Sequence, residues 1–167
     1  MEEPSISAER LREILHYDPE TGVFTWNIST NNFVKIGSVA GSPDDKGYLL
    51  IQIDGRRHKA HRLAWLYETG KWPRDMIDHV NGISSDNRFA NLREATRSEN
   101  MCNKGTPANN RTGLKGVRWR SEHRRWQAQI GVNGQKKHLG YFSTPEEAHA
   151  AYAAAAKAFH GDFARVR

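Results

Sequence analysis

The sequence predicts an α+β protein built from two parts. Residues 1–103 mix short helix and strand patterns, whereas residues 114–167 show three segments with the period of strands and then one helix. Residues 104–113 are small, polar and rich in turn formers, which predicts a linker. The charge balance changes at the same place, from 13 basic against 15 acidic residues in 1–103 to 12 against 4 in 104–167. We therefore expect two domains, of which the second is strongly basic.

Composition narrows the class of protein. With 167 residues, 26% of them charged, and a mean hydropathy of -0.79, the chain is expected to be soluble, with no membrane span. The first residues are acidic and lack the basic patch and apolar run of a secretion signal, so we expect an intracellular, cytoplasmic protein of a bacterium or a phage-infected cell. The single cysteine, Cys102, excludes an internal disulfide framework and a multi-cysteine cluster, so no structural zinc is expected.

The first part carries a local signal for each element. Ser7 is an N-cap residue, Gly70 is a helix stop, and Asp54-Gly55 is a tight-hairpin dipeptide. The predicted elements are a helix over 7–16, a turn over 17–22, a strand over 23–26, hairpin strands over 48–53 and 57–60, and a helix over 61–69.

The second part is predicted to be a three-stranded antiparallel sheet packed on one helix. The strands cover 115–120, 125–132 and 135–142, and the last two are joined by Asn133-Gly134, a favoured hairpin dipeptide. Thr144 begins the helix as its N-cap, with Glu147 three residues later. The helix body over 148–159 is rich in alanine, which allows close packing on a sheet.

Four polar residues form a candidate site for phosphodiester chemistry. Asn91 and Asn100 follow His79 by twelve and twenty-one residues, and Asp78 directly precedes it. Hydrolysis requires an activated water and a cation; a histidine accepts a proton at neutral pH, and carboxylate and amide oxygens suit Mg²⁺ or Mn²⁺. Adjacent strand residues point to opposite sides, so Asp78 and His79 reach one metal only if the strand is distorted or His79 approaches from the side.

The segment 61–103 resembles the HNH endonucleases of homing type found in phages and other mobile elements. The resemblance is carried by Asp78-His79, Asn81-Gly82, Asp86-Asn87-Arg88, Asn91-Leu92-Arg93, Thr96 and Ser98-Glu99-Asn100. It implies a ββα-metal fold that binds a single divalent ion, Mg²⁺ or Mn²⁺. The implied roles are metal ligands for Asp78 and Asn100, general base for His79, and a brace of the loop and of His79 for Asn91. Asn100 stands where many members have His, as it does in several DNA-nicking members.

Each of these residues also has a simpler interpretation. Asp78 and His79 before Asn81-Gly82 are compatible with a turn whose side chains cap backbone groups. Asn91 is either a structural brace or a catalytic aid, and Asn100 alone is a solvated helix residue. Arg93 either contacts phosphate or forms a surface ion pair. His61 and Arg62 stand where family members often have His-Arg-Leu, and a helix start explains them equally well.

Strict alternation divides the predicted C-terminal sheet into a basic face and an apolar face. The apolar face, expected to cover the helix, holds Val117, Trp119, Trp126, Ala128, Ile130, Val132, Leu139 and Tyr141. The basic face, expected to contact double-stranded DNA in the major groove, holds Arg118, Arg120, Arg125, Gln127, Gln129, Lys136 and His138.

Residues 112–166 resemble the ethylene-response-factor (Apetala-type) DNA-binding domain. The motifs are Lys115-Gly116-Val117-Arg118, 126–130, 138–142 and 146–152. The resemblance implies DNA contacts by Lys115, Arg118, Arg120, Arg125, Lys136 and His138. His138 replaces a tryptophan of the plant domains, and Lys137 occupies a usually apolar position.

The leading hypothesis is a metal-dependent DNA endonuclease, nicking or cutting both strands, that the C-terminal domain targets to double-stranded DNA. No protein partner is identifiable, and a monomer is compatible with the sequence. One alternative is a DNA-binding regulator with an inactive nuclease-like domain. Another is an RNA-binding module, which is less favoured because the aromatic residues are predicted on the core face of the sheet.

Overall fold

The computed structural model describes residues 6–29, 34–106, 110, 112–132 and 134–166. The chain divides into two compact units, one up to Ala95 and one from Thr96 onward. The boundary lies before the helix over Arg97–Asn103, which we predicted to belong to the first domain, 1–103. Of the predicted linker, residues 107–109 and 111 lie outside the described part of the chain, as does Asn133 of the predicted hairpin.

In its described residues, the first unit contains small sheets and two helices. Three antiparallel sheets are formed by β1 with β2, by β3 to β5 in sequential order, and by β6 with β7. The elements in chain order are α1 (Ala8–Ile14), β1 (Leu15–Asp18), β2 (Val23–Trp26), β3 (Ser42–Pro43), β4 (Leu49–Ile53), β5 (Arg56–Lys59), α2 (Ala60–Thr69), β6 (Met76–His79), the 3-10 turn η1 (Phe89–Asn91) and β7 (Leu92–Ala95).

The predicted local signals act as expected. The Ser7 hydroxyl accepts the amide of Arg10 and caps α1, and α2 ends at Gly70 in the left-handed region with φ 73°. Asp54 and Gly55 both have positive φ, 47° and 80°, as the tight turn between β4 and β5 requires. Residues 15–18 were predicted as helix end and turn but form β1, which pairs with β2.

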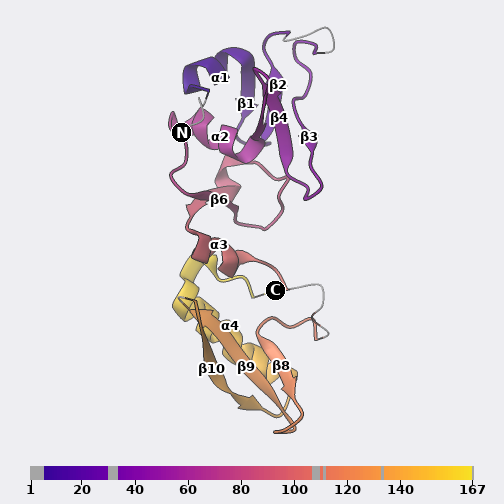
Figure 1. Ribbon diagram of the computed structural model, residues 1–167, viewed down its shortest axis with the longest axis vertical. Coiled ribbons are helices and arrows are strands. Elements are labelled where there is room, and N and C mark those ends of the chain that lie inside the picture. The colour runs from indigo at the N-terminus through magenta and orange to yellow at the C-terminus, as the bar shows by residue number, and fades with distance from the viewer. Residues whose placement is uncertain (1–5, 30–33, 107–109, 111, 133, 167) are drawn as a thin grey trace. The chain divides into compact units, whose positions relative to one another are not determined.

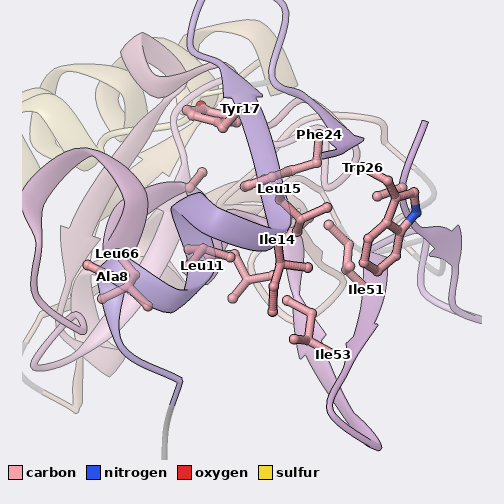
Figure 2. Packing of buried hydrophobic residues seen from close by; sticks show 14 of the residues in the cluster. Ala8, Leu11, Ile14, Leu15, Tyr17, Phe24, Trp26, Ile51, Ile53 and Leu66 are labelled. Atoms are coloured by element: carbon pink, nitrogen blue, oxygen red, sulfur yellow. The ribbon is translucent and has the colours of Figure 1, made fainter. Parts of the chain in front are cut away.

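The core of the first unit lies between α1, α2 and the strands β1, β2 and β4 (Figure 2). Leu11, Ile14 and Leu15 are fully buried there, as the spacing of their apolar stripe predicts. Tyr17 extends this core to the loop between β6 and β7, because its hydroxyl donates to the carbonyl oxygen of Asn87 at 2.7 Å. A closely packed core thus holds the loop between β6 and β7 from behind.

An antiparallel sheet with a long helix on one face forms the main part of the second unit (Figure 1). The buried residues of the long helix are Ala148, Tyr152 and Ala156, and they pack on Ala128 and Ile130 of the sheet. The elements are α3 (Arg97–Asn103), β8 (Val117–Arg120), β9 (Arg125–Val132), β10 (Gln135–Phe142), α4 (Pro145–His160) and the 3-10 turn η2 (Gly161–Phe163), with strand order β10-β9-β8. Thr144 and Glu147 form the predicted capping box of α4.

A β-bulge in β10 changes which side chains share a face. His138 pairs with Gln129, but Gly140 pairs with Ala128, so Leu139 is an extra residue in the ladder. Beyond the bulge, Tyr141 lies opposite Gln127 and therefore on the basic face. The prediction that Tyr141 faces the helix was wrong, because the bulge shifts the alternation by one residue.

Candidate functional site

The two antiparallel strands β6 and β7 carry the central residues of the site. Asp78 is opposite Arg93 and His79 is opposite Leu92, and the side chains of both Asp78 and His79 are buried. The two neighbours then have different partners: Asp78 contacts Arg93, and His79 contacts Asn87 in the loop. The strand thus holds a carboxylate and an imidazole next to each other with separate supports.

A buried ion pair holds Asp78. Nε and Nη2 of Arg93 both donate to Oδ2 of Asp78, at 2.9 and 2.8 Å. The exposed fraction is 5% for the Asp78 side chain and 18% for that of Arg93. Of the two interpretations of Arg93, the structure supports the ion pair over the phosphate contact, and it places the pair beneath the surface. Little water screens this attraction, which makes each partner costly to remove.

His79 is oriented by Asn87, a residue for which the sequence predicted no role. Nε2 of His79 lies 3.2 Å from Oδ1 of Asn87, and Asn87 is almost completely buried. With an amide oxygen as its partner, Nε2 carries the hydrogen and Nδ1 carries the lone pair. Burial lowers the pKa of His79 below its ordinary value, against the smaller opposing effects of Asn87 and Asp78. His79 is therefore a neutral base at physiological pH.

Asn91 braces the loop between the two strands. Its Nδ2 donates to the carbonyl oxygen of Asp86 at 2.8 Å and to Oδ1 of Asn81 at 3.1 Å. Its Oδ1 accepts the amide of Asn81 at 3.0 Å. These bonds favour the structural interpretation of Asn91, and the side chain that bonds the His79 ring is that of Asn87.

His61, in the first turn of α2, lies directly beside His79. The two rings meet edge to face with centroids 5.0 Å apart, and Tyr48 packs against both. His61 is 5% exposed, and its Nδ1 is buried without a hydrogen-bond partner. Burial lowers the pKa of His61 to about 3, with the charge of His79 acting in the same direction. The sequence did not predict that His61 lies beside His79 in the folded chain.

The buried His61 predicts a loss of stability in mild acid. The unfolded chain takes up a proton near pH 6.5, whereas the folded state does so only near 3, so the stability is complete above pH 6.5 and is lost as pH falls toward 3. This group alone should lower the free energy of unfolding by about 2 kcal/mol between pH 6.5 and about pH 5. Urea unfolding at several pH values gives the free energy of unfolding as a function of pH, and this free energy should fall less steeply with decreasing pH in His61→Gln than in the wild type. The matched control is His16→Gln, which removes an exposed histidine of the same unit. If the free energy of unfolding depends on pH equally in the wild type and both variants, the lowered pKa of His61 is contradicted.

The second predicted metal ligand belongs to the other compact unit. Asn100 lies in α3, which Thr96 caps in a capping box with Glu99. Among the described residues, no group of three or more His, Cys, Asp or Glu gathers as a metal site. Taken by itself, the Asp78 carboxylate is a suitable ligand for Mg²⁺ or Mn²⁺, since Mg²⁺ needs only one or two carboxylates and keeps several waters. The donor chemistry fits such an ion, with Arg93 already bonded to one oxygen of Asp78.

The basic face of the second unit is linked across its three strands by side-chain hydrogen bonds. Nε of Arg120 donates to Oε1 of Gln127 at 2.7 Å, and Nε2 of Gln127 bonds Nδ1 of His138 at 2.9 Å. Gln127 is only 8% exposed, so its amide serves the sheet itself, which disagrees with the predicted reading of adenine. Arg118, Arg125 and Lys136 are exposed on this face, as predicted.

Lys115 has a structural function in place of the predicted DNA contact. Its ammonium donates to the carbonyl oxygens of Cys102, Lys104 and Arg165, at 2.8, 2.6 and 2.9 Å. Three bonds use all three donors of a lysine, and burial lowers the pKa of Lys115. Lys115 joins the end of α3 to the C-terminal segment within the second unit.

Known proteins resemble the chain over the candidate site. Residues 58–102 match a family model described as HNH endonuclease. The chain is 33% identical over 110 residues to "Protein 3.8" of Escherichia phage T7, which covers 65% of this chain and 90% of that protein. It is 33% identical over 116 residues to "Uncharacterized HNH endonuclease L560" of Acanthamoeba polyphaga mimivirus, which covers 68% of this chain and 59% of that protein. No solved structure is significantly similar to the chain. Within the described ranges, no helix has the length and apolar character to cross a membrane.

Proposed function

Because this chain belongs to the HNH endonuclease family, we propose that it is an endonuclease that hydrolyses phosphodiester bonds of DNA with a divalent metal ion. The observation that carries the proposal is the state of His79: Asn87 holds its Nε2 at 3.2 Å, which leaves the lone pair on Nδ1. Burial keeps this base neutral. A neutral, oriented imidazole beside a carboxylate is what activation of water requires.

In the proposed reaction, Nδ1 of His79 accepts a proton from a water molecule whose oxygen forms the new bond to phosphorus. The bond from phosphorus to one ester oxygen breaks, and that oxygen leaves with the cut strand. Asp78 would hold the metal ion, and the HNH resemblance implies Asn100 as the second ligand. When bound, the ion would neutralise charge on the phosphoryl and leaving oxygens. Asn87 keeps the ring of His79 in one tautomer, and Asn91 keeps the loop that carries Asn87 in shape.

The second unit is proposed to hold the enzyme on double-stranded DNA. Its support is the exposed cations Arg118, Arg125 and Lys136 on one sheet face, with α4 on the other. Such cations displace counterions from phosphates and so gain affinity that depends on salt. The resemblance of residues 112–166 to the ethylene-response-factor domain supports the same role.

A second candidate function is a DNA-binding regulator with an inactive nuclease-like domain. The observation that favours it is the Asp78 carboxylate, which Arg93 already holds through two nitrogens. If Arg93 keeps that position on DNA, the carboxylate does not bind a metal ion through this oxygen.

A plasmid cleavage assay separates the two functions. The purified chain is incubated with supercoiled plasmid in Mg²⁺, in Mn²⁺ or in EDTA. An endonuclease gives relaxed or linear product in at least one metal and none in EDTA, and the ratio of the two products distinguishes nicking from cutting both strands. Intact plasmid in both metals, together with retained DNA binding, would refute the endonuclease and support the regulator.

A further inference from the structure

Tyr141 is an exposed aromatic residue on the basic face of the C-terminal sheet. The bulge at Leu139 turns it to this side, where it lies opposite Gln127 and is 37% exposed. Gly140, with φ 135°, allows the bulge, and a Cβ there would press on the ring of Phe142 at 3.2 Å. The backbone thus directs Phe142 toward the helix side and Tyr141 away from it.

Two further rings adjoin Tyr141. The centroid of the His123 ring lies 4.4 Å from that of Tyr141, and the centroid of the His138 ring lies 4.6 Å away. The interplanar angles are 48° and 53°, and both histidines are exposed. The three residues, here called the Tyr141 cluster, come from β10 and from the turn between β8 and β9. They form an aromatic surface on an otherwise polar sheet face.

The surroundings of the Tyr141 cluster are cationic, and the nearest amide is already bonded within the protein. Arg118 of β8 lies opposite Gln127 of β9, and Arg125 is exposed at the start of β9. The side-chain amide of Gln127 is hydrogen-bonded to Arg120 and His138, so it is poorly placed to bond base edges in a duplex. Exposed aromatic rings among cations are the usual means of binding single strands, because the faces of bases are hidden inside a duplex.

We propose that the Tyr141 cluster is a stacking site for an unpaired base of single-stranded DNA, with Arg118 and Arg125 on the neighbouring phosphates. The choice of DNA over RNA rests on the proposed endonuclease function. The site extends that function, because it gives the basic face a preference for DNA that is unpaired near the contact.

The test compares single-stranded and duplex DNA of one sequence by fluorescence anisotropy, with the full chain in EDTA so that nothing is cut. Stacking contributes about 1–3 kcal/mol per base, so Tyr141→Ala should raise the Kd for the single strand roughly 5- to 150-fold. The Kd for the duplex should change less than about 2-fold, and Tyr141→Phe should restore single-strand binding because the ring remains. The slope of log Kd against log salt should not change in Tyr141→Ala, since no charge is lost.

Arg118→Ala is the matched control on the same face. It should weaken both forms of DNA and lower the salt slope by about 1, which separates a phosphate contact from a stacking contact. His123→Ala, in the exposed turn, is a second variant that removes one flanking ring without touching a strand, and it should weaken single-strand binding selectively. The proposal is overturned if Tyr141→Ala and His123→Ala weaken both DNA forms equally or neither, or if single-stranded RNA of the same sequence binds more tightly than DNA. Because the assay requires no cleavage, an inactive but Tyr141-dependent binder would refute only the endonuclease.

Discussion

His79→Ala is expected to lower the rate of plasmid cleavage by about 10²- to 10⁴-fold, the usual contribution of a general base. The variant removes the only group that we assign to proton removal, while Asp78 keeps its bonds to Arg93. Metal-dependent stabilisation and DNA binding should therefore persist. The measurement is the initial rate of loss of supercoiled plasmid at saturating Mg²⁺ or Mn²⁺.

The control for this variant is His16→Ala, which removes an exposed histidine on β1 of the same unit and should cleave at the wild-type rate. The pH profile gives a second, independent readout. Since burial lowers the pKa of His79 from 6.5, the base is deprotonated already below that value, and the cleavage rate should stay level down to below pH 6.5. If His79→Ala cleaves at the wild-type rate, His79 has no part in the mechanism. If the cleavage rate already falls with decreasing pH above pH 6.5, the lowered pKa of His79 is contradicted.

Local signals in the sequence predicted most of the elements. Ser7, Gly70 and Thr144 start or stop helices where the structure has them, because a cap depends on residues within one helical turn. Asp54-Gly55 fixed a hairpin for the same reason. The first strand, Leu15–Asp18, was missed because its pairing with β2 outweighs its own short pattern.

The supports of the site could not be predicted, because they depend on contacts between segments. Asn87 and His79 are eight residues apart, yet only the fold of the loop brings the amide to the ring. His61 reaches the same place from α2, a separate element. Lys115 binds carbonyl oxygens of residues up to 50 positions away, where strand alternation carries no information. The bulge before Tyr141 had one visible signal, the isolated Gly140 within a strand pattern.

The ion pair between Arg93 and Asp78 leads to the prediction with the largest effect on stability. Arg93→Met should lower the free energy of unfolding by about 3–5 kcal/mol in EDTA, because it removes the cation that donates two hydrogen bonds to a buried carboxylate. The Asp78 side chain is 5% exposed, so water does not replace the lost contacts. Urea unfolding monitored by tryptophan fluorescence measures the change. The double variant Asp78→Asn with Arg93→Met should lose less stability than Arg93→Met alone, since it removes the buried negative charge as well.

Arg88→Met is the matched control, because it breaks another Arg–Asp pair in the same unit, Arg88 with Asp86 at 2.6 Å. The Arg88 side chain is 52% exposed, so its loss should be much smaller than that of Arg93. If the two variants lose the same free energy of unfolding, burial of the Asp78–Arg93 pair adds nothing to its effect on stability.

Mg²⁺ then tests whether Asp78 is a metal ligand without any measurement of activity. A ligand that binds only the folded state stabilises it by an amount that grows with its concentration above the Kd. In Arg93→Met the carboxylate has lost its competing cation, so added Mg²⁺ should restore part of the lost stability and should stabilise this variant more than the wild type. Asp78→Asn with Arg93→Met should not respond, because the carboxylate is gone. If Mg²⁺ stabilises neither the wild type nor Arg93→Met, Asp78 serves only as an ion-pair residue. The DNA-binding regulator then becomes the better-supported function.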